Sequence, residues 1–183
     1  MQFETNLLDR IARIRLLAFD IDGTLTDGGI FLSADGETKR FDVHDGAGIA
    51  LAIKAGLRVA FITGRASDAV SRRAAELGVT EVHQGVKNKI AVLSEIVARE
   101  GLSLDEVFYM GDDLPDLPAF SVVGLSAAPA NATTEIKRHA HYIAREKGGY
   151  GAAREVIEII LRNQGRWDGL VAEMMKQAEG LAQ

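Results

Sequence analysis

The amino-acid sequence predicts an α/β fold: a Rossmann-like three-layer sandwich in which a central parallel sheet lies between two layers of helices. Short apolar runs alternate along the chain with longer stretches of helical composition, which is the pattern of successive β-α-β units. Residues 16–19 are apolar without interruption, as is typical of a strand buried on both faces of a parallel sheet. The 183 residues are enough for one sizeable core, so residues 1–183 are predicted to form a single domain.

After the strand at 16–19, further strands are predicted at 58–62, 81–83, 106–110 and 122–125. Helices are predicted between them at 48–55, 67–77, 88–100 and 114–120. The earlier helices are followed by glycines suited to C-terminal caps, namely Gly56, Gly78 and Gly101. Beyond these elements, the pattern predicts a helix at 132–138, a short strand at 142–143 and a strongly apolar helix around 156–161.

Residues 29–43 depart from this alternation and predict a β-hairpin that projects from the loop after the first strand. Residues 30–32 and 38–41 flank a turn that contains Asp35-Gly36. Two strands alone are marginal in water, so we expect the hairpin to pack against something else, with a neighbouring subunit as the candidate. The tail 163–183 carries Trp167 and Met174-Met175, and is either an amphipathic helix that seeks a partner surface or a frayed terminus.

The composition of the chain excludes some partners and some types of metal ligand. The net charge of −5, without a basic cluster, argues against nucleic acid as a partner. The chain has no cysteine, so any metal must be held by oxygen or imidazole ligands. Residues 1–15 lack the pattern of a signal peptide, and no apolar run approaches the length of a membrane span. We therefore expect a cytoplasmic protein with no membrane partner.

Asp20 and Asp22 follow the first predicted strand, at the edge of the sheet where ligands bind in α/β folds. Side chains two residues apart in a strand point the same way, and two close carboxylates repel unless a cation joins them or one is protonated. The pair therefore predicts a metal site, a proton-transfer role, or both. A simple Asp-Gly turn at Asp22-Gly23 is the alternative for this segment taken alone.

Other predicted strands end in polar groups at the same edge. Thr63-Gly64-Arg65 offers a hydroxyl, an amide and a guanidinium that can grip a phosphate. Lys89 opens the helix after the third strand, with Lys87 as its competitor for a phosphate or a carboxylate. An acidic cluster follows Gly111 and consists of Asp112, Asp113 and Asp116. Asp112 is the better metal ligand, and Asp113 or Asp116 is the candidate helix cap. Mg²⁺ is the expected ion.

Taken in order, Asp-x-Asp, Thr-Gly-Arg, Lys and Gly-Asp-Asp resemble the motifs of the haloacid dehalogenase superfamily of phosphotransferases, over about residues 16–123. The resemblance implies that Asp20 attacks phosphorus and forms an aspartyl-phosphate. Asp22 would protonate the leaving alcohol and then take a proton from the hydrolytic water. The implied holders of the phosphate are Thr63, the Gly64 amide and Lys89, and those of Mg²⁺ are Asp20, Asp112 and the backbone carbonyl of Asp22.

The chain leaves no room for the cap domain that many members carry, because only the hairpin and one helix separate the first two main strands. Within the superfamily, the segments 26–29, 43–49, 148–155 and 164–165 resemble the 3-deoxy-D-manno-octulosonate 8-phosphate phosphatases. That resemblance implies a homotetramer whose hairpins form a central barrel, and a role in making the inner sugar of lipopolysaccharide. The sugar-acid pocket would be lined by Asp42, Val43, His44, Asp45, Gly46, Arg65 and Arg73.

One position departs from the pattern. Ala50 stands where members of that family often have a basic residue, which keeps a nonulosonate 9-phosphate open as the substrate. A phosphatase-like module that only assembles, without catalysis, is the alternative from another class. The intact motif residues favour an active enzyme.

Overall fold

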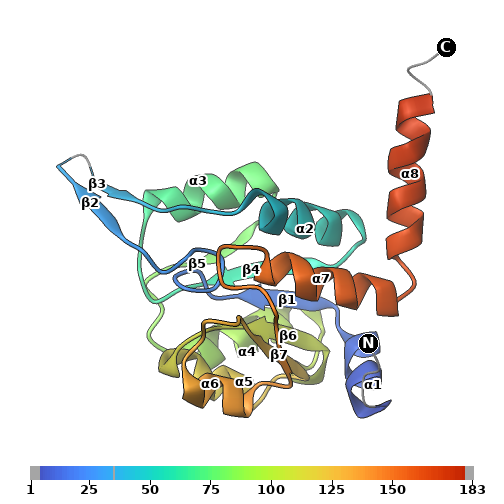
Figure 1. The fold of residues 1–183 in the computed structure, drawn as a ribbon. Helices are drawn as coiled ribbons and strands as arrows, with labels where there is room; N and C mark the ends of the chain where they lie inside the picture. Colours follow the sequence, from blue (N-terminus) through green and yellow to red (C-terminus); the bar gives the residue numbers. More distant parts are fainter. Residues whose placement is uncertain (1–4, 35, 180–183) are drawn as a thin grey trace.

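The computed structural model describes residues 5–34 and 36–179, and the side chains of 7–34 and 36–176. Its main sheet is parallel, in the order β5-β4-β1-β6-β7-β8 (Figure 1). The strands are β1 (Leu16–Phe19), β4 (Arg58–Ile62), β5 (Glu81–His83), β6 (Val107–Met110), β7 (Leu125–Ala128) and β8 (Tyr142–Ile143). The predicted α/β sandwich is confirmed.

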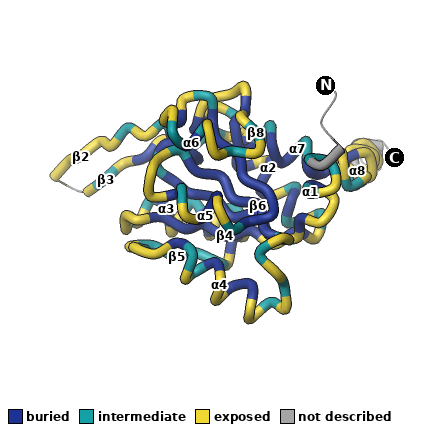
Figure 2. The backbone as a smooth tube through the Cα atoms, turned by 90° about the horizontal axis from the view of Figure 1, so that it is seen from below, coloured by how far each residue is buried: buried dark blue, intermediate teal, exposed yellow. Residues whose placement is uncertain are grey.

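Alternate side chains of the strands face two separate cores. Leu17 and Phe19 of β1 belong to the core beneath α1 (Thr5–Arg13), α2 (Val43–Lys54), α3 (Asp68–Leu77) and α7 (Ala152–Asn163). Leu16 and Ala18 belong to the core beneath α4 (Lys89–Glu100), α5 (Leu117–Phe120) and α6 (Thr134–His139). The inner strands β1, β4, β6 and β7 are almost entirely buried, and Figure 2 shows the dark blue of buried residues at the centre of the molecule. Burial on both faces explains why the run 16–19 shows no polar alternation.

The predicted hairpin is confirmed, but its second strand lies closer to the turn, at 36–38 rather than 38–41, and the predicted turn residue Asp35 lies outside the described residues. β2 (Phe31–Ser33) pairs antiparallel with β3 (Gly36–Thr38), and the hairpin projects away from the sheet (Figure 1). The ladder stops at Thr38 because Lys39 turns to Asp22, and Arg40 donates a hydrogen bond to the carbonyl of Gly149 (2.8 Å). Phe31 and Leu32 are 63% and 78% exposed, so within one chain their apolar surface faces solvent.

Several boundaries differ from the predictions. α2 begins at Val43 rather than 48, because the carboxylate of Asp42 caps it and accepts a hydrogen bond from the amide of His44 (2.7 Å). β7 begins at Leu125, three residues later than expected. α1 was not predicted. The tail forms α8 (Trp167–Glu179), which extends from the body (Figure 1).

Short 3-10 turns at Leu104–Glu106 and Leu114–Asp116 precede β6 and α5. Between β1 and β4, the described residues hold only the hairpin and α2, so no cap domain is inserted there. Across the described ranges, none of the helices has the length and apolar character required for a membrane span.

Candidate active site

The carboxyl ends of β1, β4 and β6 meet the start of α4 around a cavity of about 290 Å³. β1 lies between β4 and β6, where the chain order of the sheet changes direction, and ligands of open α/β sheets bind at such switch points. The predicted site residues that line this cavity are Asp20, Asp22, Thr63, Gly64, Arg65, Lys89 and Asp112. The strand ends thus bring together groups that lie far apart in the sequence.

A cluster of carboxylates forms the floor of the cavity. Asp20, Asp112 and Asp116 each offer one oxygen, and these atoms lie within 4.8 Å of one another. Burial, followed by the charge of Asp116, raises the pKa of both Asp20 and Asp112 to about 7. The cluster therefore carries negative charge that the protein alone does not fully offset. Hard carboxylate oxygens at this spacing fit Mg²⁺.

Asp116 is the one member of the cluster that was not predicted as a site residue. Its Oδ1 accepts hydrogen bonds from Lys89 Nζ (2.5 Å) and Tyr109 Oη (2.7 Å). Its Oδ2 accepts from the amides of Asp112 (3.0 Å) and Asp113 (3.2 Å). With both oxygens engaged, Asp116 serves as the anchor of the loop. The expectation that Asp113 or Asp116 is a helix cap holds for Asp113, which accepts from the amide of Leu114 (2.8 Å).

Lys89 is buried at the first residue of α4, where the side chain of Asn88 caps the helix by accepting from the amide of Ala91 (3.1 Å). Its Nζ donates to Asp20 Oδ1 at 2.6 Å, as well as to Asp116. Burial alone would lower the pKa of Lys89, but the two carboxylates raise it above its ordinary value. Lys87 lines the cavity but is exposed, so the geometry separates the two candidate lysines.

Glycine is required where the loop after β1 turns. Gly23 has a φ of +89°, and a Cβ there would collide with the carboxylate of Asp112. Thr24 Oγ1 donates to Asp112 Oδ1 (3.2 Å), which ties this loop to the end of β6. Gly148 packs directly against the carbonyl of Gly23, so the glycine-rich loop before α7 supports the loop that carries Asp20 and Asp22.

Thr63 is buried at the end of β4, and its Oγ1 accepts from the amide of Arg65 (3.2 Å). The Arg65 side chain reaches the hairpin, where its Nη2 lies 2.6 Å from Glu37 Oε2. Asp22 also contacts the hairpin region, because Lys39 Nζ bonds to its Oδ1. Lys39 was not predicted as a site residue, and no local motif marks it.

The other predicted pocket residues do not line this cavity in a single chain. Asp42 caps α2, and its carbonyl accepts from Arg73 Nη2 (3.3 Å), the guanidinium that packs against Gly46. Val43 and His44 are exposed. Asp45 differs from the expectation most, because its buried carboxylate accepts hydrogen bonds from the amides at the start of α7.

Comparisons with known proteins agree with this geometry. A family model described as haloacid dehalogenase-like hydrolase matches residues 79–155. The chain is 41% identical over 164 residues to the 3-deoxy-D-manno-octulosonate 8-phosphate phosphatase of Escherichia coli strain K12, covering 89% of this chain and 87% of the relative.

Two solved structures are also similar. A hypothetical protein from Xanthomonas campestris has a TM-score of 0.91 and 46% identity, with 94% of this chain and 95% of that chain covered. A 3-deoxy-D-manno-octulosonate 8-phosphate phosphatase from Moraxella catarrhalis, in complex with magnesium ion, phosphate ion and a KDO molecule, has a TM-score of 0.90 and 38% identity. That match covers 93% of this chain and 99% of the other.

Proposed function

Because the chain belongs to the 3-deoxy-D-manno-octulosonate 8-phosphate phosphatases, a family of haloacid dehalogenase-like hydrolases, we propose that it hydrolyses the phosphate monoester of this sugar acid with Mg²⁺ as its cofactor. The identity to the Escherichia coli enzyme, extending over 89% of the chain, is the observation that carries the substrate. The predicted enzyme class, a phosphoric monoester hydrolase, is confirmed by the family.

In the proposed reaction, Asp20 attacks phosphorus, the ester P–O bond breaks, and a bond from the Asp20 carboxylate to phosphorus forms. Asp22 gives its proton to the departing alcohol oxygen. In the second half, Asp22 takes a proton from a water that attacks the aspartyl-phosphate, which releases inorganic phosphate and restores Asp20. Thr63, the Gly64 amide and Lys89 hold the phosphoryl oxygens, since all three line the same cavity as Asp20.

Asp20, Asp112 and the backbone carbonyl of Asp22 would hold the Mg²⁺. The raised pKa values of Asp20 and Asp112 support this assignment, because a divalent cation favours the ionised form of both carboxylates and so opposes the burial, and then the repulsion, that raise them. Asp116 is excluded as a ligand in the proposal, since Lys89, Tyr109 and two amides already occupy its oxygens. When bound, the ion screens the nucleophile from the phosphate and stabilises the charge that spreads over the phosphoryl oxygens.

The proposal includes a homotetramer in which a neighbouring subunit completes the site. The hairpin exposes apolar surface at Ile30, Phe31 and Leu32. An isolated two-stranded hairpin is only marginally stable in water, so contact with another subunit would stabilise it. Val43 and His44 are exposed and lie outside the cavity of their own chain, so these two residues of the segment 42–46 are available to a neighbour's substrate. Light scattering of the purified protein tests this, and a monomer at micromolar concentration would contradict it. We also propose a cytoplasmic location and a role in lipopolysaccharide inner-sugar synthesis.

A phosphate-release assay tests the function, with the specificity constant compared between 3-deoxy-D-manno-octulosonate 8-phosphate and a nonulosonate 9-phosphate. We expect Mg²⁺-dependent turnover and a clear preference for the octulosonate ester. A preference for the nonulosonate ester would overturn the substrate assignment, in line with the departure at Ala50. Absence of turnover on any phosphate ester would support the non-catalytic module instead.

A further inference from the structure

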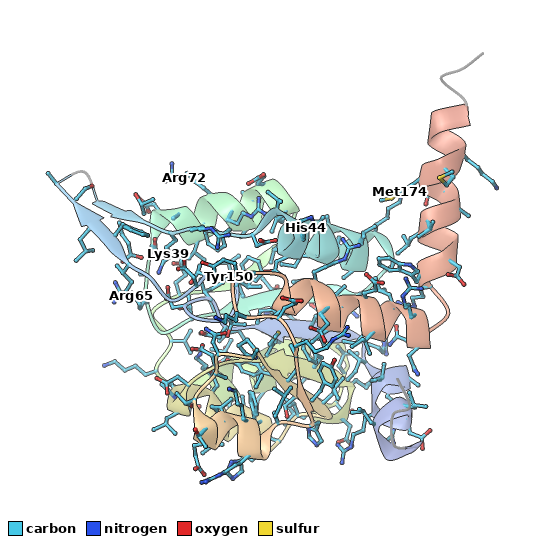
Figure 3. All side chains as sticks on the ribbon, viewed as in Figure 1. Lys39, His44, Arg65, Arg72, Tyr150 and Met174 are labelled. Atoms are coloured by element: carbon cyan, nitrogen blue, oxygen red, sulfur yellow. The ribbon has the colours of Figure 1, made fainter. Side chains whose placement is uncertain are left out.

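Lys39 is a buried cation at the base of the hairpin, directly after β3 (Figure 3). None of its side chain is exposed. Its Nζ contacts Asp22 Oδ1 and lies 2.8 Å from Glu37 Oε1. A buried ammonium is tolerated only when it is paired and hydrogen-bonded, and here carboxylates from two elements provide the pairing.

Glu37 extends this contact toward Arg65. Arg65 Nη2 lies 2.6 Å from Glu37 Oε2, on the side of the carboxylate away from Lys39. Hydrogen bonds from Lys39 and Arg65 lower the pKa of Glu37 to about 2, so Glu37 is ionised near neutral pH. The result is a chain of alternating charges, Asp22–Lys39–Glu37–Arg65, which we call the hairpin charge chain. Both of its ends line the catalytic cavity.

The hairpin charge chain includes Asp22, which is the general acid in the proposed function. A general acid must present its proton within hydrogen-bond reach of the departing oxygen. Asp22 lies in the loop beyond the end of β1, where its side chain could adopt several rotamers without the contact to Lys39. Lys39 removes that freedom by binding one carboxylate oxygen, and the ionised Glu37 offsets the positive charge that Lys39 brings.

We propose that Lys39 is a positioning residue for phosphate-ester hydrolysis: it holds Asp22 through Oδ1 and thereby presents Oδ2 to the leaving alcohol oxygen. The inference rests on the proposed function. Lys39 does not touch the reacting atoms. The proton passes from Asp22 to the alcohol oxygen as the ester P–O bond breaks and the bond from Asp20 to phosphorus forms.

If Lys39 only stabilises the position of the hairpin, its loss should lower the rate for every substrate alike. If Lys39 positions the general acid, its loss should lower the rate only for substrates whose leaving group needs a proton. An alkoxide leaves poorly without protonation, whereas an activated aryl oxide departs without it. The leaving group therefore separates the two roles.

The test compares the full-length Lys39→Met variant with the wild type on 3-deoxy-D-manno-octulosonate 8-phosphate and on p-nitrophenyl phosphate, each with saturating Mg²⁺. We expect kcat for the sugar-acid ester to fall roughly ten- to hundred-fold with little change in KM. The loss for the aryl ester should be smaller by at least about ten-fold. Asp22→Asn should show the same bias toward the aryl ester, and Lys39→Arg should recover part of the lost kcat.

Lys54→Met is the matched control, because it makes the same change in charge and breaks an exposed ion pair with Glu173 (2.8 Å) far along α2. Circular dichroism and molecular mass in solution establish that each variant folds and assembles. If Lys39→Met does not fold, Glu37→Gln tests the same chain, with a smaller loss in kcat and the same bias between the esters.

Equal losses on the two esters, a change in KM alone, or no loss would overturn the positioning role. The wild-type rate on the sugar-acid ester, measured in the same assay, tests the proposed function separately. A failure of that function is therefore distinguished from a failure of the inference.

Discussion

Asp45 joins two helices that are far apart in the sequence, and its protonation should govern how firmly they are held. It lies on α2, and its carboxylate accepts hydrogen bonds from the amides of Gly151 (3.2 Å) and Arg154 (2.8 Å) at the start of α7. The residue is only 2% exposed. Burial therefore raises its pKa from 3.8 to about 6, although the amides act in the opposite direction.

The size of the effect follows from this change. A rise in pKa from 3.8 to about 6 corresponds to about 3 kcal/mol in the free energy of unfolding. Because the folded state binds the proton more tightly, this stabilisation is fully present below about pH 3 and is lost as the pH rises through about 6. Asp45→Asn keeps the side-chain size and removes the titration. The stability of the wild type relative to this variant should therefore fall by about 3 kcal/mol between about pH 3 and about pH 7.5.

Urea unfolding followed by circular dichroism, at one protein concentration and several pH values, measures this difference. Asp9→Asn serves as the control, because it removes an exposed carboxylate on α1 and reports the general effect of losing one negative charge. A difference in stability between wild type and Asp45→Asn that stays constant with pH would show that folding does not change the pKa of Asp45. A relative stability of the wild type that rises with pH would show that folding lowers this pKa.

Three further predictions follow from the catalytic site. Asp20→Asn should abolish turnover while circular dichroism shows a retained fold, and substantial phosphate release by this variant would exclude Asp20 as the nucleophile. Gly148→Ala should lower the free energy of unfolding by about 1–3 kcal/mol and reduce kcat, because its Cβ would collide with the carbonyl of Gly23. Gly169→Ala, a position in α8 with open space around it, is the control for thermal unfolding and should not destabilise. Dialysis against EDTA should eliminate phosphate release and added Mg²⁺ should restore it; turnover that survives chelation would contradict the assigned cofactor.

The local sequence pattern was sufficient to predict most strands of the sheet and most helices that cover it. β1, β4 and β5 were predicted with their observed ends. β1 and most of β4 are short apolar segments flanked by polar residues, whereas β5 (Glu81–His83) is mostly polar and was placed by its position between two predicted helices. β7 was placed three residues too early, since Val122 and Val123 look like the start of a strand. Both of their amides instead donate to the carbonyl of Ala119 and close the turn after α5. The sequence pattern does not show whether a backbone amide bonds within a turn or to a neighbouring strand.

Some residues of the candidate site could be predicted from the sequence and others could not. Asp20, Thr63 and Asp112 could be found from the sequence because each lies within two residues of the end of a strand, and parallel topology brings those ends together. Lys39 and Asp116 could not, since their importance comes from contacts with residues 17 and 27 positions away along the chain. Burial of these groups, and the pairing it demands, is decided by tertiary structure.

Mass spectrometry of the wild-type enzyme, rapidly quenched in acid during turnover with Mg²⁺, detects the aspartyl-phosphate at Asp20 on which the proposed mechanism depends. The peptide carrying Asp20 should gain the mass of one phosphoryl group, and this mass should disappear once the substrate is consumed. A phosphoryl group on any other residue, or turnover in which the Asp20 peptide never carries one, would exclude Asp20 as the nucleophile.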